Sequence, residues 1–172
     1  MRTLIKNARL LDPATDLDTS GDLLIEDGLI LEIGEITASA DDTIDASGLC
    51  LAPGLIDLRV KTGEPGNEHL ETLATASRAA VSGGVTSMVI MPDTDPAIDD
   101  VALVELIARR GETTALNRIY PAGALTQGLR AEQMAEIGLM QEAGAVFFSN
   151  GDRSVPNPSL MKRALVYAAS HG

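Results

Sequence analysis

The chain has 172 residues and a formal net charge of −12, and 45% of its residues are hydrophobic. That length buries roughly 70% of the unfolded surface, enough for one sizeable core. The acidic balance, with two tyrosines, two phenylalanines and no tryptophan, argues against nucleic-acid or anionic-membrane binding, which needs a basic footprint. Because the sequence shows no apolar run of about 18 residues and no signal-peptide core, we expect a cytoplasmic protein.

The first 52 residues show short apolar runs separated by turn signals. Asp27-Gly28 between two such runs predicts a hairpin, because both turn residues tolerate a positive φ. The expected strands cover residues 4–11, 22–26 and 29–33, with a further extended piece over residues 41–51. This segment is therefore predicted to be part of a small all-β layer. Its Cys50 is the only cysteine, which excludes an internal disulfide and predicts a buried structural thiol.

After Pro53-Gly54 the pattern changes to alternating strands and helices. The expected strands cover residues 55–61, 85–91, 117–122 and 145–149, and the expected helices cover residues 68–82, 99–110, 131–143 and 158–170. Four strand–helix units in succession predict an α/β fold with a parallel sheet and helices on its outside.

Two architectures fit four such units, an open doubly wound sheet and half of an eight-stranded barrel. The sequence has no Gly-x-Gly-x-x-Gly and no Gly-Lys-Ser/Thr phosphate loop to support a nucleotide-binding sheet. Gly83-Gly84 ends a predicted helix and is not followed by a third glycine. The half-barrel is therefore the favoured interpretation.

Two cations stand near the end of the first strand of this series. Arg59 and Lys61 are two residues apart, so they project from the same face of a strand. One hypothesis is an anion-binding site at the carboxyl end of the strands. The other, which we favour, is pairing with nearby carboxylates, because buried charges seldom lack partners. The candidate partners are Asp93, Asp95 and Asp152.

The remaining polar candidates have simpler structural explanations. His69 precedes a predicted helix and His171 ends another, and a lone histidine is seldom a metal ligand. Turn formation and helix capping explain an acidic run that could otherwise suggest a site for Ca²⁺ or Mg²⁺. The run consists of Asp93, Asp95, Asp99 and Asp100.

Several motifs in chain order resemble dihydroorotases of the amidohydrolase superfamily. They include Ala52-Pro53-Gly54-Leu55-Ile56-Asp57, Glu64-Pro65-Gly66, Gly83-Gly84-Val85-Thr86, Met91-Pro92-Asp93-Thr94-Asp95-Pro96 and Leu160-Met161-Lys162-Arg163-Ala164-Leu165. The resemblance covers essentially the whole chain. It implies the amino-terminal part of a TIM barrel, with about four βα units over residues 53–172, preceded by a partial β-sandwich over residues 1–52.

The resemblance also implies that the chemical positions have changed. In that family the first barrel strand ends in His-x-His, which binds metal, and an arginine two residues later binds substrate; Arg59, Lys61 and Gly63 stand at these positions. Asp93 replaces an asparagine that contacts substrate. Asn150 aligns with a metal-bridging aspartate, for which Asp152 could substitute only if its loop were shifted. We therefore expect no catalytic residue, metal ligand or cofactor in this chain.

The function implied is that of a dihydroorotase-like protein of pyrimidine biosynthesis that has lost metal-binding and substrate-binding residues. Aspartate carbamoyltransferase is the partner that the resemblance suggests. The alternative is a working metal-dependent cyclic amidohydrolase, converting dihydroorotate to N-carbamoyl-aspartate with zinc held by ligands from a missing carboxyl-terminal half. A third possibility is a small-anion sensor. Because half a barrel leaves two strand edges open, we expect the missing half or a homo-oligomer to complete it.

Overall fold

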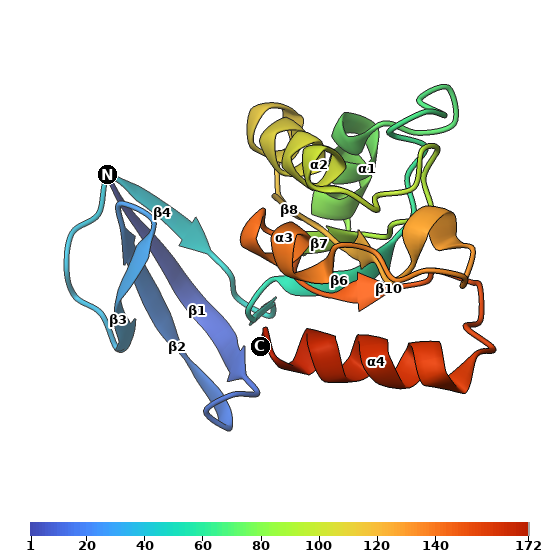
Figure 1. Ribbon diagram of the computed structural model, residues 1–172. Helices are drawn as coiled ribbons and strands as arrows, with labels where there is room; N and C mark the ends of the chain where they lie inside the picture. Colours follow the sequence, from blue (N-terminus) through green and yellow to red (C-terminus); the bar gives the residue numbers. More distant parts are fainter. Residues whose placement is uncertain (172) are drawn as a thin grey trace. The chain divides into compact units, whose positions relative to one another are not determined.

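The computed structural model of the protein describes residues 1–171 and contains two compact units, Met1–Pro53 and a second unit that begins at Gly54 (Figure 1). The first unit is a five-stranded sheet, and the second alternates strands and helices. Among the residues described, no helix is both long enough and apolar enough to cross a bilayer.

The sheet of the first unit has the strand order β3-β2-β1-β4, with β5 also paired to β1. β1 is antiparallel to β2 and parallel to β4 and β5. The turn between β2 and β3 has a positive φ at both Asp27 (50°) and Gly28 (82°), which confirms the predicted hairpin. The strands are β1 Arg2–Asp12, β2 Leu17–Glu26, β3 Leu29–Gly34, β4 Asp42–Asp45 and β5 Cys50–Leu51.

One face of this sheet carries an apolar row that crosses four strands. Ile33 pairs with Leu23, Leu23 with Ile5, and Ile5 with Ile44. The prediction for Cys50 was wrong, because its side chain is exposed. Side chains alternate along a strand, and in the two-residue strand β5 it is Leu51 that packs against the core.

The second unit contains four successive strand–helix units, as predicted. β6, β7 and β8 form one parallel sheet, and β9 pairs in parallel with β10. Only Ala122 separates β8 from β9. The strands are β6 Leu55–Val60, β7 Val85–Ile90, β8 Arg118–Pro121, β9 Gly123–Ala124 and β10 Phe148–Ser149. The helices are α1 Leu73–Ser82, α2 Val101–Thr114, the short 3₁₀ helix η1 Gln127–Leu129, α3 Ile137–Glu142 and α4 Pro158–Ala169.

The core of this unit lies between the sheet and the helices α1, α2 and α3. α1 contacts β7, α2 contacts β8, and each of these helices also contacts the next one (Figure 1). Met88 and Ile90 of β7, Ile107 of α2 and Met140 of α3 are completely buried. Burying one such side chain contributes about 1.5–3 kcal/mol, so this layer accounts for much of the stability of the unit.

Three helices begin later than predicted. α1 begins at Leu73 and not at residue 68, because the Thr72 side chain accepts a hydrogen bond from the Thr75 backbone amide and closes a capping box. α2 begins at Val101 and not at residue 99, because Asp100 alone caps it by accepting a hydrogen bond from the Leu103 backbone amide. α3 loses its predicted first six residues, which form an irregular segment that begins with a positive φ of 60° at Ala131.

Candidate functional site

Three loops meet at the carboxyl edge of the parallel strands in the second unit. Lys61 follows β6, Asp93 lies three residues after β7, and Asp152 lies three residues after β10. Parallel strands end at the same edge of their sheet, which is where sites in this class of fold are built. The topology therefore brings together residues that are up to 93 positions apart in the sequence.

Four charged side chains from these strands and loops form one group, which we call the ion-pair cluster. The Arg59 guanidinium donates to Oδ1 of Asp152, and the Lys61 ammonium donates to Oδ2 of the same carboxylate. Lys61 Nζ also lies 2.6 Å from Oδ2 of Asp93. The favoured hypothesis of charge pairing is thus confirmed for Asp93 and Asp152. The cluster is not buried as expected, since the side chain of Asp152 is 61% exposed and that of Lys61 is 46% exposed.

The electrostatics of the cluster are mutually stabilising. The hydrogen bond from Lys61 lowers the pKa of the Asp152 carboxyl group, and the positive charges of Lys61 and Arg59 act in the same direction. The hydrogen bonds to Asp152 and Asp93 raise the pKa of Lys61 in turn. Two positive and two negative charges balance in the cluster.

Gly63, where the resemblance led us to expect the family's substrate-binding arginine, lies in the loop between β6 and α1. Its backbone N–H donates to the carbonyl oxygen of Glu71 over 3.1 Å. A Cβ atom at this position would overlap the carbonyl oxygen of Asn67 and lie 2.9 Å from that of Glu71. The loop is therefore folded so closely around Gly63 that any side chain requires the backbone to move.

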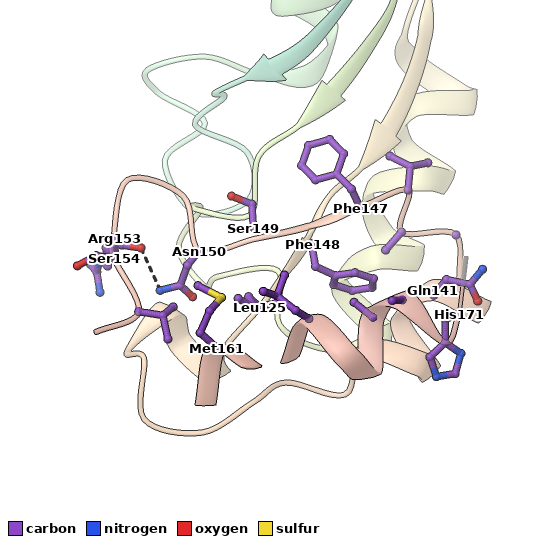
Figure 2. Close-up of a pocket in the computed structure, with 17 residues that line it drawn as sticks. Leu125, Gln141, Phe147, Phe148, Ser149, Asn150, Arg153, Ser154, Met161 and His171 are labelled. Atoms are coloured by element: carbon purple, nitrogen blue, oxygen red, sulfur yellow. Dashed lines mark hydrogen bonds between the residues drawn. The ribbon is translucent and has the colours of Figure 1, made fainter. Parts of the chain in front are cut away.

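Asn150, where the resemblance led us to expect the family's bridging aspartate, is 7% exposed and has a structural role. Its Oδ1 accepts a 2.6 Å hydrogen bond from the hydroxyl group of Thr126, and its Nδ2 donates to the carbonyl oxygens of Leu129 and Arg153 at 3.4 Å. Figure 2 shows this side chain directed toward Arg153. Its polar atoms thus join the loop after β9 to the loop after β10.

Sequence reasoning did not identify the role of Glu64. This carboxylate is buried, and its Oε1 accepts a hydrogen bond from Arg110 of α2. Its Oε2 accepts a 2.8 Å hydrogen bond from the backbone N–H of Leu73, the first residue of α1. The position of Glu64 shortly before a predicted helix could have indicated this role, because carboxylates stabilise the amino termini of helices.

The zinc that the resemblance implies does not fit the donors present here. Arg59 and Lys61 offer no free electron pairs, and the carboxylate of Asp152 already accepts hydrogen bonds from both. His69 is exposed in the turn before α1, and Asp99 accepts a hydrogen bond from the Gly128 backbone amide. Within residues 1–171, no three histidine, cysteine, aspartate or glutamate side chains gather in a way that could hold a metal ion.

A cavity of about 1100 Å³ lies beside β10 and α4 (Figure 2). Its lining is largely apolar and includes Phe148 of β10 and Met161 and Leu165 of α4, while the ion-pair cluster lies outside it. β10 pairs with β9 on one side only within the part of the chain described. This cavity therefore lies next to an open strand edge, and its polar lining residues include Ser149, Arg153 and His171.

The family model and the curated relatives agree on one family. The family model described as dihydro-orotase-like matches residues 48–171. A dihydroorotase of Pelobacter propionicus is 46% identical over 170 residues, which cover 98% of this chain and 40% of that protein. A dihydroorotase-like protein of Pseudomonas putida is 44% identical over 172 residues, covering 99% of this chain and 41% of that protein.

Solved structures show the same fold. An L-hydantoinase (dihydropyrimidinase) from Arthrobacter aurescens superposes with a TM-score of 0.84 at 24% identity, covering 98% of this chain and 38% of the hydantoinase. The chain thus spans about 40% of the length of the curated relatives it matches. Because the family model covers most of the sequence and both relatives exceed 40% identity, the chain belongs to the dihydroorotase-like family of the amidohydrolase superfamily.

Proposed function

We propose that this chain belongs to a non-catalytic, dihydroorotase-like protein. The observation that carries the proposal is the ion-pair cluster, because two cations occupy the positions where the family resemblance places metal-binding histidines, and both bind the carboxylate of Asp152. Two further positions support it. Gly63 has no space for the substrate-binding arginine, and Asn150 uses its side chain to join two loops.

The role that follows is assembly with aspartate carbamoyltransferase, in pyrimidine biosynthesis and hence in the cytoplasm. The contacts that shape the scaffold are formed in this chain: Glu64 joins α1 to α2, and Thr72 caps α1. The positions where we expect the family's metal-binding and substrate-binding groups hold other residues. An intact scaffold without the chemical groups is what a structural partner requires.

Association with the transferase is the experiment that tests this role. The longest natural form of the protein is mixed with aspartate carbamoyltransferase of the same organism at micromolar concentration, and sedimentation velocity is recorded. We expect a complex with a dissociation constant in or below the micromolar range, while an unrelated protein of similar acidity sediments separately. Independent sedimentation of the two chains would remove the main support for a scaffold role.

Completion of the barrel by further polypeptide is part of the proposal. Within residues 1–171, β6 pairs only with β7 and β10 only with β9, so each has an open edge. Leu55, Ile56 and Leu58 of β6 are more than 60% exposed. Open edges and exposed apolar strands favour additional pairing, by the remaining half of a full-length protein or by a second copy. The apolar row of the first unit would likewise be covered by a second layer of a β-sandwich.

The second candidate is a working cyclic amidohydrolase that converts dihydroorotate to N-carbamoyl-aspartate. It is favoured by the 46% identity to a relative named dihydroorotase. It requires zinc to be held by residues outside this chain, because the donors within it do not fit the metal. Zinc content distinguishes the two candidates, since the hydrolase needs bound metal and the scaffold does not.

A further inference from the structure

The carboxylate of Asp152 lies between two cations at an exposed position. Arg59 donates to one carboxylate oxygen and Lys61 to the other, so each oxygen has its own cation. The two cations come from one strand and its extension, where alternate side chains share a face. We propose that Arg59 and Lys61 form a binding site for a small carboxylate anion, which the side chain of Asp152 occupies in this structure.

Asp152 is connected to the site in a way that allows it to leave. Asn150, two residues earlier, is buried and fixed by its hydrogen bonds to Thr126, Leu129 and Arg153. Asp152 itself is 61% exposed, and its recorded side-chain partners are Arg59 and Lys61. Its carboxylate can therefore turn into solvent while Asn150 keeps the loop in place. An anion from solution can reach the same two cations.

The group that the site holds in this structure indicates the class of anion that it would bind. Asp93 lies 2.6 Å from Lys61 and is 22% exposed, so it remains as a second partner of that ammonium group when Asp152 leaves. Asp57, on the same face of β6, accepts a 2.9 Å hydrogen bond from the Arg59 backbone N–H. Arg130 and Arg153 line a depression together with Asp93, so carboxylates and cations both lie near the site. The site is therefore assigned to a carboxylate, the group that it holds in this structure. This inference concerns a ligand and does not depend on the scaffold role proposed above.

The test removes the internal carboxylate and measures the affinity for acetate. Asp152→Asn is made in the longest natural form, and sodium acetate is titrated against sodium chloride at constant ionic strength. Melting temperature and the NMR signal of the Arg59 side-chain Nε–H report binding. The variant should bind acetate at least about tenfold more tightly than the natural protein, because a tethered competitor with an effective concentration of about millimolar or higher has been removed.

Two variants serve as controls. The double variant Lys61→Met with Asp152→Asn should not show the increased affinity for acetate, because one of the two cations is missing. Asp18→Asn changes the net charge by the same amount and releases a carboxylate that Arg9 holds at 2.7 and 2.6 Å in the first unit. Asp18→Asn should leave the affinity for acetate unchanged from the natural protein. It frees only one cation, Arg9, whereas the proposed site contains two.

The proposal is overturned if Asp152→Asn gains no affinity, or if the same gain is seen with Asp18→Asn or with the double variant. If Asp152→Asn does not fold, the natural protein provides the test. High acetate concentrations should then increase hydrogen exchange in residues 151–154 relative to chloride, because the anion displaces Asp152. Unchanged exchange in that segment at saturating acetate would equally refute the proposal.

Discussion

Replacement of Glu64 by alanine should destabilise the second unit more than most single substitutions. The Glu64 side chain is 5% exposed, whereas that of Arg110 is 49% exposed. Removing the carboxylate deprives the buried N–H of Leu73 of its acceptor and leaves Arg110 without its partner. Leu73 itself is completely buried, so solvent replaces the lost acceptor poorly.

The magnitude follows from these two contacts. A buried donor left without an acceptor costs about 1–3 kcal/mol. Breaking a fully buried ion pair costs about 3–5 kcal/mol, but the half-exposed Arg110 recovers hydration, so only a fraction of that applies. We expect Glu64→Ala to lower the free energy of unfolding by about 2–4 kcal/mol. Glu64→Gln, which keeps an acceptor for Leu73 but loses the charge, should cost about 1–2 kcal/mol.

Urea unfolding of the longest natural form, followed by circular dichroism, measures both effects. The midpoint concentration should fall in the order natural protein, Glu64→Gln, Glu64→Ala, with an unchanged slope. Glu26→Ala is a suitable control, because Glu26 forms a partly exposed pair with Arg2 in the first unit. A cost below about 0.5 kcal/mol for Glu64→Ala, the level of ordinary surface substitutions, would show that the contacts of Glu64 with Leu73 and Arg110 do not stabilise the fold.

Three further predictions concern the other site positions. Asn150→Ala should lower the free energy of unfolding in urea by about 1–3 kcal/mol, because it leaves the buried Thr126 hydroxyl group without its acceptor. An unchanged midpoint concentration would show that the hydrogen bonds of Asn150 between the two loops do not contribute to stability. Gly63→Ala and Gly63→Arg should lower the melting temperature by similar amounts, because the Cβ atom common to both overlaps the backbone at Asn67; a stable Gly63→Arg protein would contradict the described loop. The pKa of Asp152 is lowered mainly by Lys61, so the pairing is complete above the ordinary aspartate pKa of about 3.9 and is lost as the pH falls through the lowered value. An NMR titration of its carboxyl carbon should give a midpoint below about 3.9 that rises in Lys61→Met, and an ordinary midpoint in the natural protein would exclude the pairing in solution.

The α/β organisation of the second unit could be predicted because its strands are short apolar runs and its helices have regular apolar spacing. The starts of the helices could not. The true start of α1 depends on the capping box of Thr72 and Thr75, which competes with equally plausible polar residues upstream. Residues 131–136 have helical composition, but the positive φ at Ala131 and a bridge between Thr126 and Met134 hold them in another conformation.

The site could be predicted only in part for a related reason. Spacing along β6 was sufficient to place Arg59 and Lys61 on one face. Which of three aspartates they contact depends on how the loops after β7 and β10 fold, and no local pattern fixes that. The contact between Glu64 and Arg110 joins a loop to the far end of α2, so it depends on the packing of α2 against α1.

The most direct test of whether this protein is non-catalytic is its zinc content, measured together with dihydroorotase activity on the same sample of the longest natural form. We expect substoichiometric zinc after purification without chelators and no turnover of dihydroorotate above background, because cations occupy the expected ligand positions. One or more zinc ions per chain together with turnover would contradict this expectation. That result would overturn the non-catalytic proposal and show that Arg59 and Lys61 lie outside the metal site.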